Sequence, residues 1–273
     1  MIKDQSTRLL ARPAQGQVAY DVRGSGPLVL LVPGMGDLRS TYRFLTPSLV
    51  AAGYTVATTD LRGQGDSTTS FSGYGDEETA GDLAALLQEL GKPAVIVGNS
   101  MAAGAAVIVA AEDPRLVSGL VLIGPFVREP AVSAAARLFF RILMAPPWAA
   151  ASWKAYLPRL YAGRKPEDFA AYRNEVVACL KRPGYALAFS LTTRTDHVRA
   201  GNSLAAVSKP TLVIMGEQDP DFSDPQAEAE WISAALSGSV TMVPDAGHYP
   251  QSQQPELTSS AILAFLGTRI HHA

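Results

Sequence analysis

The sequence predicts a fold of the α/β class, with a mostly parallel central sheet flanked by helices and a helical insertion. Short apolar runs, each the length of a buried strand, alternate with segments of helical spacing. This alternation stops after residue 125 and resumes only near residue 211, and four helical segments without a strand lie between. We therefore expect an α/β core domain of residues 1–125 and 206–273, and a helical cap, or lid, of residues 126–205.

The expected elements follow one another with clear boundaries. Leu28 to Val32 is a continuous apolar run, which is typical of a strand buried on both faces. Apolar residues recur at helical spacing from 77 to 90, and this helix ends at Gly91. In chain order we expect strands at 7–12, 17–22, 28–32, 54–58, 94–97, 117–123, 211–215 and 239–243. The first two should form an antiparallel hairpin at a sheet edge. Core helices are expected at 40–52, 77–90, 101–112, 225–236 and 255–267, and cap helices at 131–144, 148–161, 166–181 and 184–197.

Composition excludes several classes of function. The 273 residues carry a formal net charge of −2, which gives no reason to expect a nucleic-acid partner. Cys179 is the only cysteine, which excludes an intramolecular disulfide framework and fits a reducing compartment. The first residues are polar and show no signal peptide, and no apolar run is long enough for a membrane span. We expect a cytoplasmic protein; its oligomeric state is not predicted.

Charge is distributed unevenly between the two expected domains. Residues 126–205 contain twelve lysines and arginines against five acidic residues, whereas the remainder contains eleven against twenty. A solvated basic face docked on an acidic core is one interpretation. The alternative is that some of these cations steer or bind an anionic substrate.

The most informative stretch runs from Val95 to Gly104. A β-branched strand stops at Gly98, and a helix of small apolar residues begins at Met101. Ser100 lies between them, on a sharp turn that demands small neighbours and lifts its hydroxyl clear of the sheet. The hydroxyl would also lie beside the first N–H groups of the new helix, which favour developing negative charge. This pattern predicts a nucleophilic serine.

A serine nucleophile needs a base, and the base needs a group that holds its tautomer. Of four histidines, His271 and His272 are terminal and His197 lies in the expected cap, exposed or lining it. His248 lies in a Gly- and Pro-rich loop just past the last strand, which is where a catalytic base is expected. Asp219 follows the preceding strand and is the preferred acid. Alternatives close to it are Glu217 and Asp221, and we expect Asp224 to cap the next helix.

Two backbone N–H groups are expected to bind the oxyanion. One belongs to Met101, the residue after the nucleophile. The other is that of Met35, because Gly34 and Gly36 allow the backbone of the loop after the third strand to approach closely.

These motifs resemble those of the α/β-hydrolase superfamily, in particular its capped single-domain serine hydrolases, which include esterases, C–C hydrolases and haloperoxidase-like members. The resemblance covers nearly the whole chain outside the cap and rests on Gly98-Asn99-Ser100-Met101-Ala102, Pro33-Gly34-Met35-Gly36, Asp60-Leu61-Arg62-Gly63-Gln64-Gly65-Asp66-Ser67, Asp219 and Ala246-Gly247-His248. It departs from the family pattern at Ala102, usually glycine, and at Pro33, often histidine. It implies a Ser100–His248–Asp219 triad and structural roles for Asp60 and Arg62. A serine nucleophile argues against dehalogenase and epoxide-hydrolase chemistry.

The expected function is hydrolysis of a small-molecule carboxylic ester through an acyl-enzyme, without metal or organic cofactor. We expect a small-molecule substrate, for which an anionic or an aromatic compound is one option. A C–C hydrolase of dienoate ring-fission products is an alternative, because Gly98-Asn99-Ser100-Met101 is similar to the elbow of those enzymes. A receptor that retains the triad, a hydroxynitrile lyase or a cofactor-free perhydrolase are further alternatives. The aromatic residues of the cap either line an apolar pocket or pack it onto the core: Phe139, Phe140, Trp148, Trp153, Tyr156, Tyr161 and Phe169.

Overall fold

The structure, a computed structural model, describes residues 7–12, 15–129 and 133–270. These ranges contain an eight-stranded sheet with the strand order β1-β2-β4-β3-β5-β6-β7-β8. Strands β3 to β8 are parallel, whereas β1 pairs with β2, and β2 with β4, in antiparallel fashion. The strands are β1 (Arg8–Arg12), β2 (Gly16–Arg23), β3 (Leu28–Val32), β4 (Thr55–Thr59), β5 (Ala94–Asn99), β6 (Val117–Ile123), β7 (Thr211–Gly216) and β8 (Ser239–Val243). The predicted fold class is confirmed.

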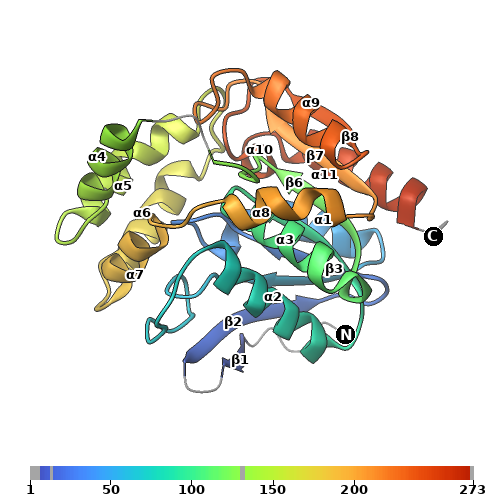
Figure 1. The fold of residues 1–273 in the computed structure, drawn as a ribbon, viewed down its shortest axis with the longest axis horizontal. Coiled ribbons are helices and arrows are strands. Elements are labelled where there is room, and N and C mark those ends of the chain that lie inside the picture. The colour runs from blue at the N-terminus through green and yellow to red at the C-terminus, as the bar shows by residue number, and fades with distance from the viewer. Residues whose placement is uncertain (1–6, 13–14, 130–132, 271–273) are drawn as a thin grey trace.

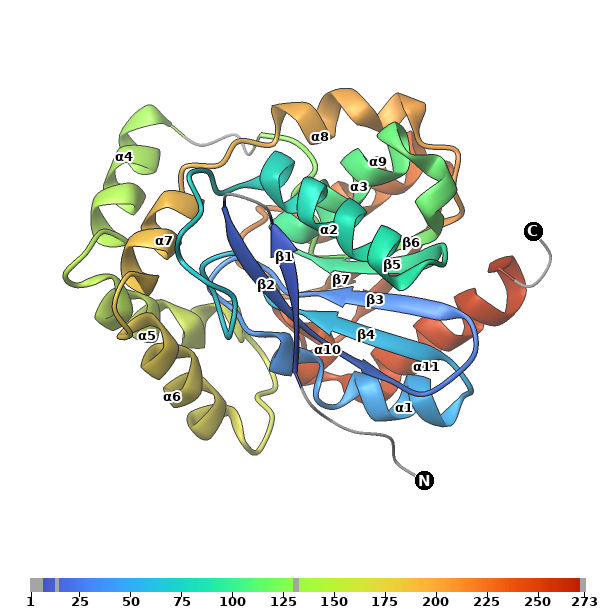
Figure 2. The same ribbon diagram turned by 90° about the horizontal axis from the view of Figure 1, so that it is seen from below.

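Helices cover both faces of this sheet (Figure 1). They are α1 (Leu45–Ala51), α2 (Asp76–Leu90), α3 (Met101–Glu112), α4 (Ala134–Leu143), α5 (Ala149–Leu160), α6 (Phe169–Leu180), α7 (Tyr185–Thr192), α8 (Val198–Ser203), α9 (Pro225–Ala235), α10 (Pro250–Gln253) and α11 (Pro255–Phe265). Figure 2 shows α2, α3, α8 and α9 on one face and α1 and α11 on the other. None of the helices in the described ranges has the length and apolar character that a membrane crossing requires.

Alternation along the buried strands divides the core between the two faces. Leu30 and Ile96 belong to the apolar cluster under α2, α3 and α9. Val29 and Leu31, on either side of Leu30 along β3, belong to the cluster under α1 and α11. Successive side chains of a strand point to opposite faces, so a strand buried on both faces must be apolar throughout. The sheet is therefore a rigid platform from which loops emerge.

The register brings the carboxyl ends of the parallel strands to one edge. Val32 at the end of β3 pairs with Gly98 of β5, and Asn99 of β5 pairs with Ile123 of β6. Gly216 at the end of β7 pairs with Val243 at the end of β8. The loops that carry the predicted nucleophile, acid and base leave the sheet at this edge, where ligands bind in open α/β sheets.

Helices α4–α7, here called the inserted helices, lie beyond that same edge (Figures 1 and 2). Trp153 of α5 donates its indole N–H to the carbonyl of Gly36 at 2.7 Å, in the loop after β3. The carbonyl of Leu160, at the end of α5, accepts the N–H of His248 at 2.8 Å, in the loop after β8. The inserted helices thus contact loops from two strands, while the predicted domain boundaries stay a prediction.

Two helix predictions are wrong in extent. The helix expected at 40–52 is divided into a 3-10 helix, η1 (Arg39–Tyr42), and α1. Pro47 has no N–H to donate to residue 43, so a continuous helix would leave a carbonyl unpaired there, whereas the first turn of α1 accepts proline. The helix expected at 184–197 ends at Thr192.

A short helix that the sequence did not predict, α8, follows that early end. It packs on α3 and α2 of the core rather than on the inserted helices. Between α7 and α8 the chain turns toward α2, because Thr195 and His197 bind the carboxylate of Asp76 there. Tertiary hydrogen bonds have overridden local helical spacing. His271 and His272 lie outside the described residues.

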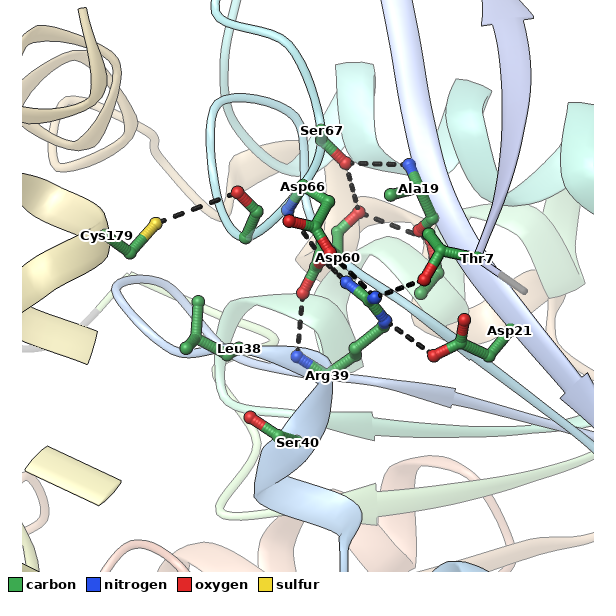
Figure 3. Close-up of polar contacts among 12 residues, drawn as sticks. Thr7, Ala19, Asp21, Leu38, Arg39, Ser40, Asp60, Asp66, Ser67 and Cys179 are labelled. Atoms are coloured by element: carbon green, nitrogen blue, oxygen red, sulfur yellow. Dashed lines mark hydrogen bonds and ion pairs between the residues drawn. The ribbon is translucent and has the colours of Figure 1, made fainter. Parts of the chain in front are cut away.

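Arg39 ties several loops to the sheet, as Figure 3 shows. Its guanidinium contacts Asp21 of β2 at 2.7 Å, Asp66 at 2.8 Å and the buried carboxylate of Asp60. Arg62, only 4% exposed, binds Asp82 of α2 through two hydrogen bonds of 2.7 and 2.8 Å. A cavity of about 510 Å³ adjoins the Arg39 cluster. Since these arginines already have carboxylate partners, their contacts account for the structural roles expected of Asp60 and Arg62.

Candidate active site

Ser100 occupies the turn between β5 and α3 with φ 58° and ψ −127°, a left-handed conformation rare outside glycine. The turn is fixed by its own backbone: the N–H of Ser100 donates to Ile123 at 2.9 Å, and its carbonyl accepts the N–H of Ala103 at 3.0 Å. The Ser100 side chain makes no capping hydrogen bond to α3, whose N-terminus it precedes. The strained turn therefore presents a hydroxyl that is not used to cap the helix.

Close backbone approach explains two glycines near Ser100. A Cβ on Gly98 would lie 2.6 Å from the carbonyl oxygen of Ala102, so only glycine fits where the strand passes the new helix. A Cβ on Gly34 would lie 2.8 Å from the Cβ of Ser100. The loop after β3 is therefore packed directly against the turn that carries Ser100, as the oxyanion prediction requires.

His248 and Asp219 meet at the ends of β8 and β7. The Nδ1 atom of His248 lies 2.7 Å from Oδ2 of Asp219, and the two residues are 2% and 1% exposed. Asn99, next to Ser100, donates its side-chain N–H to the carbonyl of His248 at 3.2 Å. The turn of the predicted nucleophile and the loop of the predicted base are thus joined by a buried amide.

Gln253 of α10 is a positioning residue that the sequence did not reveal. Its Oε1 accepts the N–H groups of Gly247 and Tyr249, on either side of His248, at 2.9 and 3.2 Å. Its Nε2 donates to the carbonyls of Ala162 and Arg164 after α5, both at 2.7 Å. A single buried amide therefore fixes the His248 loop against the segment that follows α5.

The alternative acids behave differently from Asp219. Glu217 is exposed. Asp221 places Oδ2 3.8 Å from Nδ1 of His248, beyond hydrogen-bond distance, and its Oδ1 accepts the hydroxyl of Tyr156 at 3.0 Å. Burial raises the pKa of Asp221. Asp224 caps α9 by accepting the N–H of Ala227 at 3.0 Å, as expected.

The two carboxylates control the charge of His248. Burial lowers the pKa of this imidazole, but the negative charges of Asp219 and Asp221 outweigh burial and raise the pKa from 6.5 to about 9. A carboxylate held against Nδ1 stabilises the imidazolium that a general base becomes during catalysis. The arrangement can therefore hold a proton between two steps of a reaction.

A cavity of about 360 Å³, within the range of small-molecule sites, opens over Ser100. Met35, Met101 and His248 line it together with Ser100, whereas Asp219 lies behind His248. The aromatic residues of the inserted helices divide between the two expected roles. Three of them line the cavity, namely Phe140, Trp153 and Tyr156. Tyr161 and Phe169 pack against each other, and Phe139 and Trp148 are exposed.

A divalent cation would compete with the hydrogen bond of the His–Asp pair. Ligand atoms of Asp219, Asp221 and His248 lie within 4.8 Å of one another. Nδ1 of His248, which would have to bind the ion, already contacts Asp219 at 2.7 Å. The donor set fits the orientation of an imidazole better than it fits a metal ion.

Comparison with known proteins decides the family. The profile of the Alpha/beta hydrolase family matches residues 29–261, which include every predicted site residue. The chain belongs to the alpha/beta hydrolase family. A 2-(acetamidomethylene)succinate hydrolase of Mesorhizobium japonicum is 29% identical over 268 residues, covering 92% of each chain.

Solved alpha/beta hydrolase structures are similar over nearly the whole chain. A thermophilic esterase from Thermogutta terrifontis has a TM-score of 0.78 and 27% identity over 97% of this chain and 99% of that one. A bromoperoxidase from Bacillus anthracis has a TM-score of 0.84 over 96% of this chain and 100% of that one; at 22% identity it bears on the fold alone. Together with the family match, these neighbours support an enzyme of the hydrolase type.

Proposed function

We propose that this protein is a serine hydrolase that cleaves a small-molecule carboxylic ester through an acyl-enzyme. The observation that carries the proposal is that His248 lines the same cavity as Ser100, with the buried carboxylate of Asp219 behind it, 2.7 Å from Nδ1. The reaction class is supported by the similarity to the esterase from Thermogutta terrifontis and to the 2-(acetamidomethylene)succinate hydrolase.

The proposed reaction gives each of the predicted residues a role. His248 takes the proton of Ser100 as the serine oxygen attacks the ester carbonyl, and Asp219 stays ionised and holds the imidazole. The N–H groups of Met35 and Met101 bind the oxyanion that forms. His248 then protonates the leaving alcohol. In the second half of the reaction, His248 takes a proton from water as the water oxygen attacks the acyl-enzyme, and it returns this proton to Ser100 as the acid leaves.

The cavity favours a substrate with an apolar body. Met35, Trp153 and Leu160 line one part of it, and its volume of about 360 Å³ suits a small ester. If the apolar part of the substrate binds against the inserted helices, the ester carbonyl lies next to the hydroxyl of Ser100.

An active-site probe tests the proposal directly. The intact mass of the protein is measured after reaction with a fluorophosphonate, for the wild type, Ser100→Ala, His248→Ala and the control Ser239→Ala, which changes an exposed serine of β8. We expect one adduct on the wild type and the control and none on the other two. An adduct that persists in folded Ser100→Ala would overturn the assignment.

Turnover then separates the remaining reaction classes. We expect many turnovers of 4-nitrophenyl esters per active site, and much slower cleavage of a dienoate. Ligand-induced stabilisation without turnover would indicate a receptor, and activity that requires peroxide and a carboxylic acid would indicate a perhydrolase.

A further inference from the structure

A second histidine–aspartate pair lies in the wall of the same cavity. Nδ1 of His197 is 2.8 Å from Oδ2 of Asp76, and the residues are 8% and 2% exposed. The two are 121 positions apart in sequence. His197 lines the cavity with Ser100 and His248, but it has no part in the reaction described above.

The carboxylate of this pair is firmly held. Asp76 is the first residue of α2, and its Oδ1 accepts the hydroxyl of Thr195 at 3.2 Å. Gly104 of α3 approaches so closely that a Cβ there would lie 2.7 Å from Oδ2 of Asp76. Three segments distant in sequence therefore fix the carboxylate, and with it the ring of His197.

The fixed ring leaves one polar atom for a ligand. Because Nδ1 faces Asp76, Nε2 is on the opposite edge, and no residue in the described ranges hydrogen-bonds to it. The ring of Phe126 lies between the two imidazoles, 5.4 Å from His197 and 6.0 Å from His248, centroid to centroid. The ring of Phe126 thus separates His197 from His248, and both histidines line one cavity, so His197 can meet a different part of the same substrate.

Cations of α4 lie at this end of the cavity. Arg137 contacts one carboxylate oxygen of Glu129 at 3.2 Å. The other carboxylate oxygen of Glu129 accepts the backbone N–H of His197 at 2.6 Å. Arg141 also lines the cavity and has no ion pair within the described ranges. Both arginines and Thr195 line an adjoining hollow as well, so α4 faces the segment that carries His197.

We propose that His197 and Arg141 form a subsite for a carboxylate on the substrate, apart from the ester that Ser100 attacks. Arg141 supplies a positive charge that no ion pair within the described residues holds. Nδ1 of His197 is held by Asp76, so Nε2 is the ring atom that faces the substrate, and a carboxylate accepts a hydrogen bond from it when that atom carries a proton. The proposal rests on the proposed function and adds the substrate class, an ester that bears a free carboxylate.

Two esters of equal shape test this subsite. Mono-4-nitrophenyl adipate carries a terminal carboxylate, and 4-nitrophenyl 6-oxoheptanoate carries a neutral methyl ketone in its place. We expect the wild type to prefer the adipate at least tenfold in kcat/KM. Arg141→Gln and His197→Gln should each lower this preference about tenfold, mainly through KM. Arg141→Lys should keep most of it.

The controls change charges outside the subsite. Arg115→Gln removes an arginine whose side chain is 89% exposed, and Glu217→Gln removes an exposed carboxylate that lines neither the cavity nor the adjoining hollow. We expect both to keep the preference of the wild type. Equal kcat/KM for the two esters in the wild type, or a preference that neither Arg141→Gln nor His197→Gln changes, would overturn the subsite.

A binding measurement keeps the subsite separate from the chemistry. In Ser100→Ala labelled with ¹⁵N-histidine, titration with adipate should shift the Nε2 signal of His197, which is assigned from its loss in His197→Gln. If the wild type hydrolyses neither ester but this shift occurs, the proposed function fails and the subsite stands. If both esters are hydrolysed through Ser100 but adipate leaves the signal unmoved, the subsite fails alone.

Discussion

Replacement of Asp221 by asparagine should move the pH dependence of catalysis toward acid. The Oδ2 atom of Asp221 lies 3.8 Å from Nδ1 of His248, close enough to act as a charge but too far for a hydrogen bond. Asparagine keeps an oxygen for the hydroxyl of Tyr156 and removes the charge, while Asp219 still holds the imidazole. A general base acts when deprotonated, so kcat/KM should rise with pH through the raised pKa of His248, about 9.

The size of the shift follows from the distance. Two unit charges 3.8 Å apart interact by about 1 kcal/mol in water and about 4 kcal/mol at an effective dielectric constant of 20. The smaller of the two energies sets a lower bound of about one pKa unit for the shift. The neutral fraction of His248 at pH 7 would then rise from about 1% to about 9%, and kcat/KM at that pH about ninefold.

The assay is kcat/KM for a neutral 4-nitrophenyl ester between pH 6 and pH 10, corrected for spontaneous hydrolysis. Glu217→Gln is the matched control, because it removes an exposed carboxylate from the same loop. We expect its profile to coincide with that of the wild type. An Asp221→Asn profile that is also unshifted would refute the electrostatic reasoning. A large loss at every pH would instead identify Asp221 as the acid that orients the base.

Three further predictions concern stability and the nucleophile turn. Burial raises the pKa of Asp37 from 3.8 to about 6, so its proton is bound more tightly in the folded state and stability should fall as pH rises from about 4 to 6. In urea denaturation, the free energy of unfolding of the wild type should fall by about 3 kcal/mol over this pH range, and that of Asp37→Asn should not. Arg62→Met removes the bidentate partner of the buried carboxylate of Asp82, which keeps Arg12 at 2.9 Å, and should cost about 1.5–3 kcal/mol, against under about 0.5 kcal/mol for the exposed control Arg115→Met. Gly98→Ala should lower kcat at least about tenfold with little change in KM, because the new Cβ displaces the nucleophile turn; kinetics equal to those of the wild type would contradict the close approach.

The predictable part of this protein is the part that depends on local pattern. Strands such as β3 and β6 are found in the sequence because a strand buried on both faces must be apolar throughout. Ser100 and His248 were singled out because each follows a predicted strand, and parallel strands bring their carboxyl ends to one edge. The structure brings both to one cavity, and the triad itself stays a prediction.

The rest depends on contacts between segments that are far apart in the chain. Asp76 begins an ordinary helix, and His197 follows a run that is typical of another; no local pattern joins them. Their hydrogen bond ends α7 early, so the same contact explains both a wrong helix boundary and an unpredicted wall of the cavity. The break near Pro47 is different, because it could have been read from the missing N–H of proline.

The position of His248 depends on the inserted helices as well as on the core. Its N–H donates to Leu160 at the end of α5, and Gln253 fixes both sides of its loop against the segment that follows. On the side of Ser100, the side-chain amide of Asn99 donates to the carbonyl of His248. A displacement of α5 would therefore move the imidazole relative to Ser100, although neither residue belongs to an inserted helix. Substrate that packs against Trp153 of α5 would act on the geometry of the base through this connection, so binding and chemistry share one set of contacts.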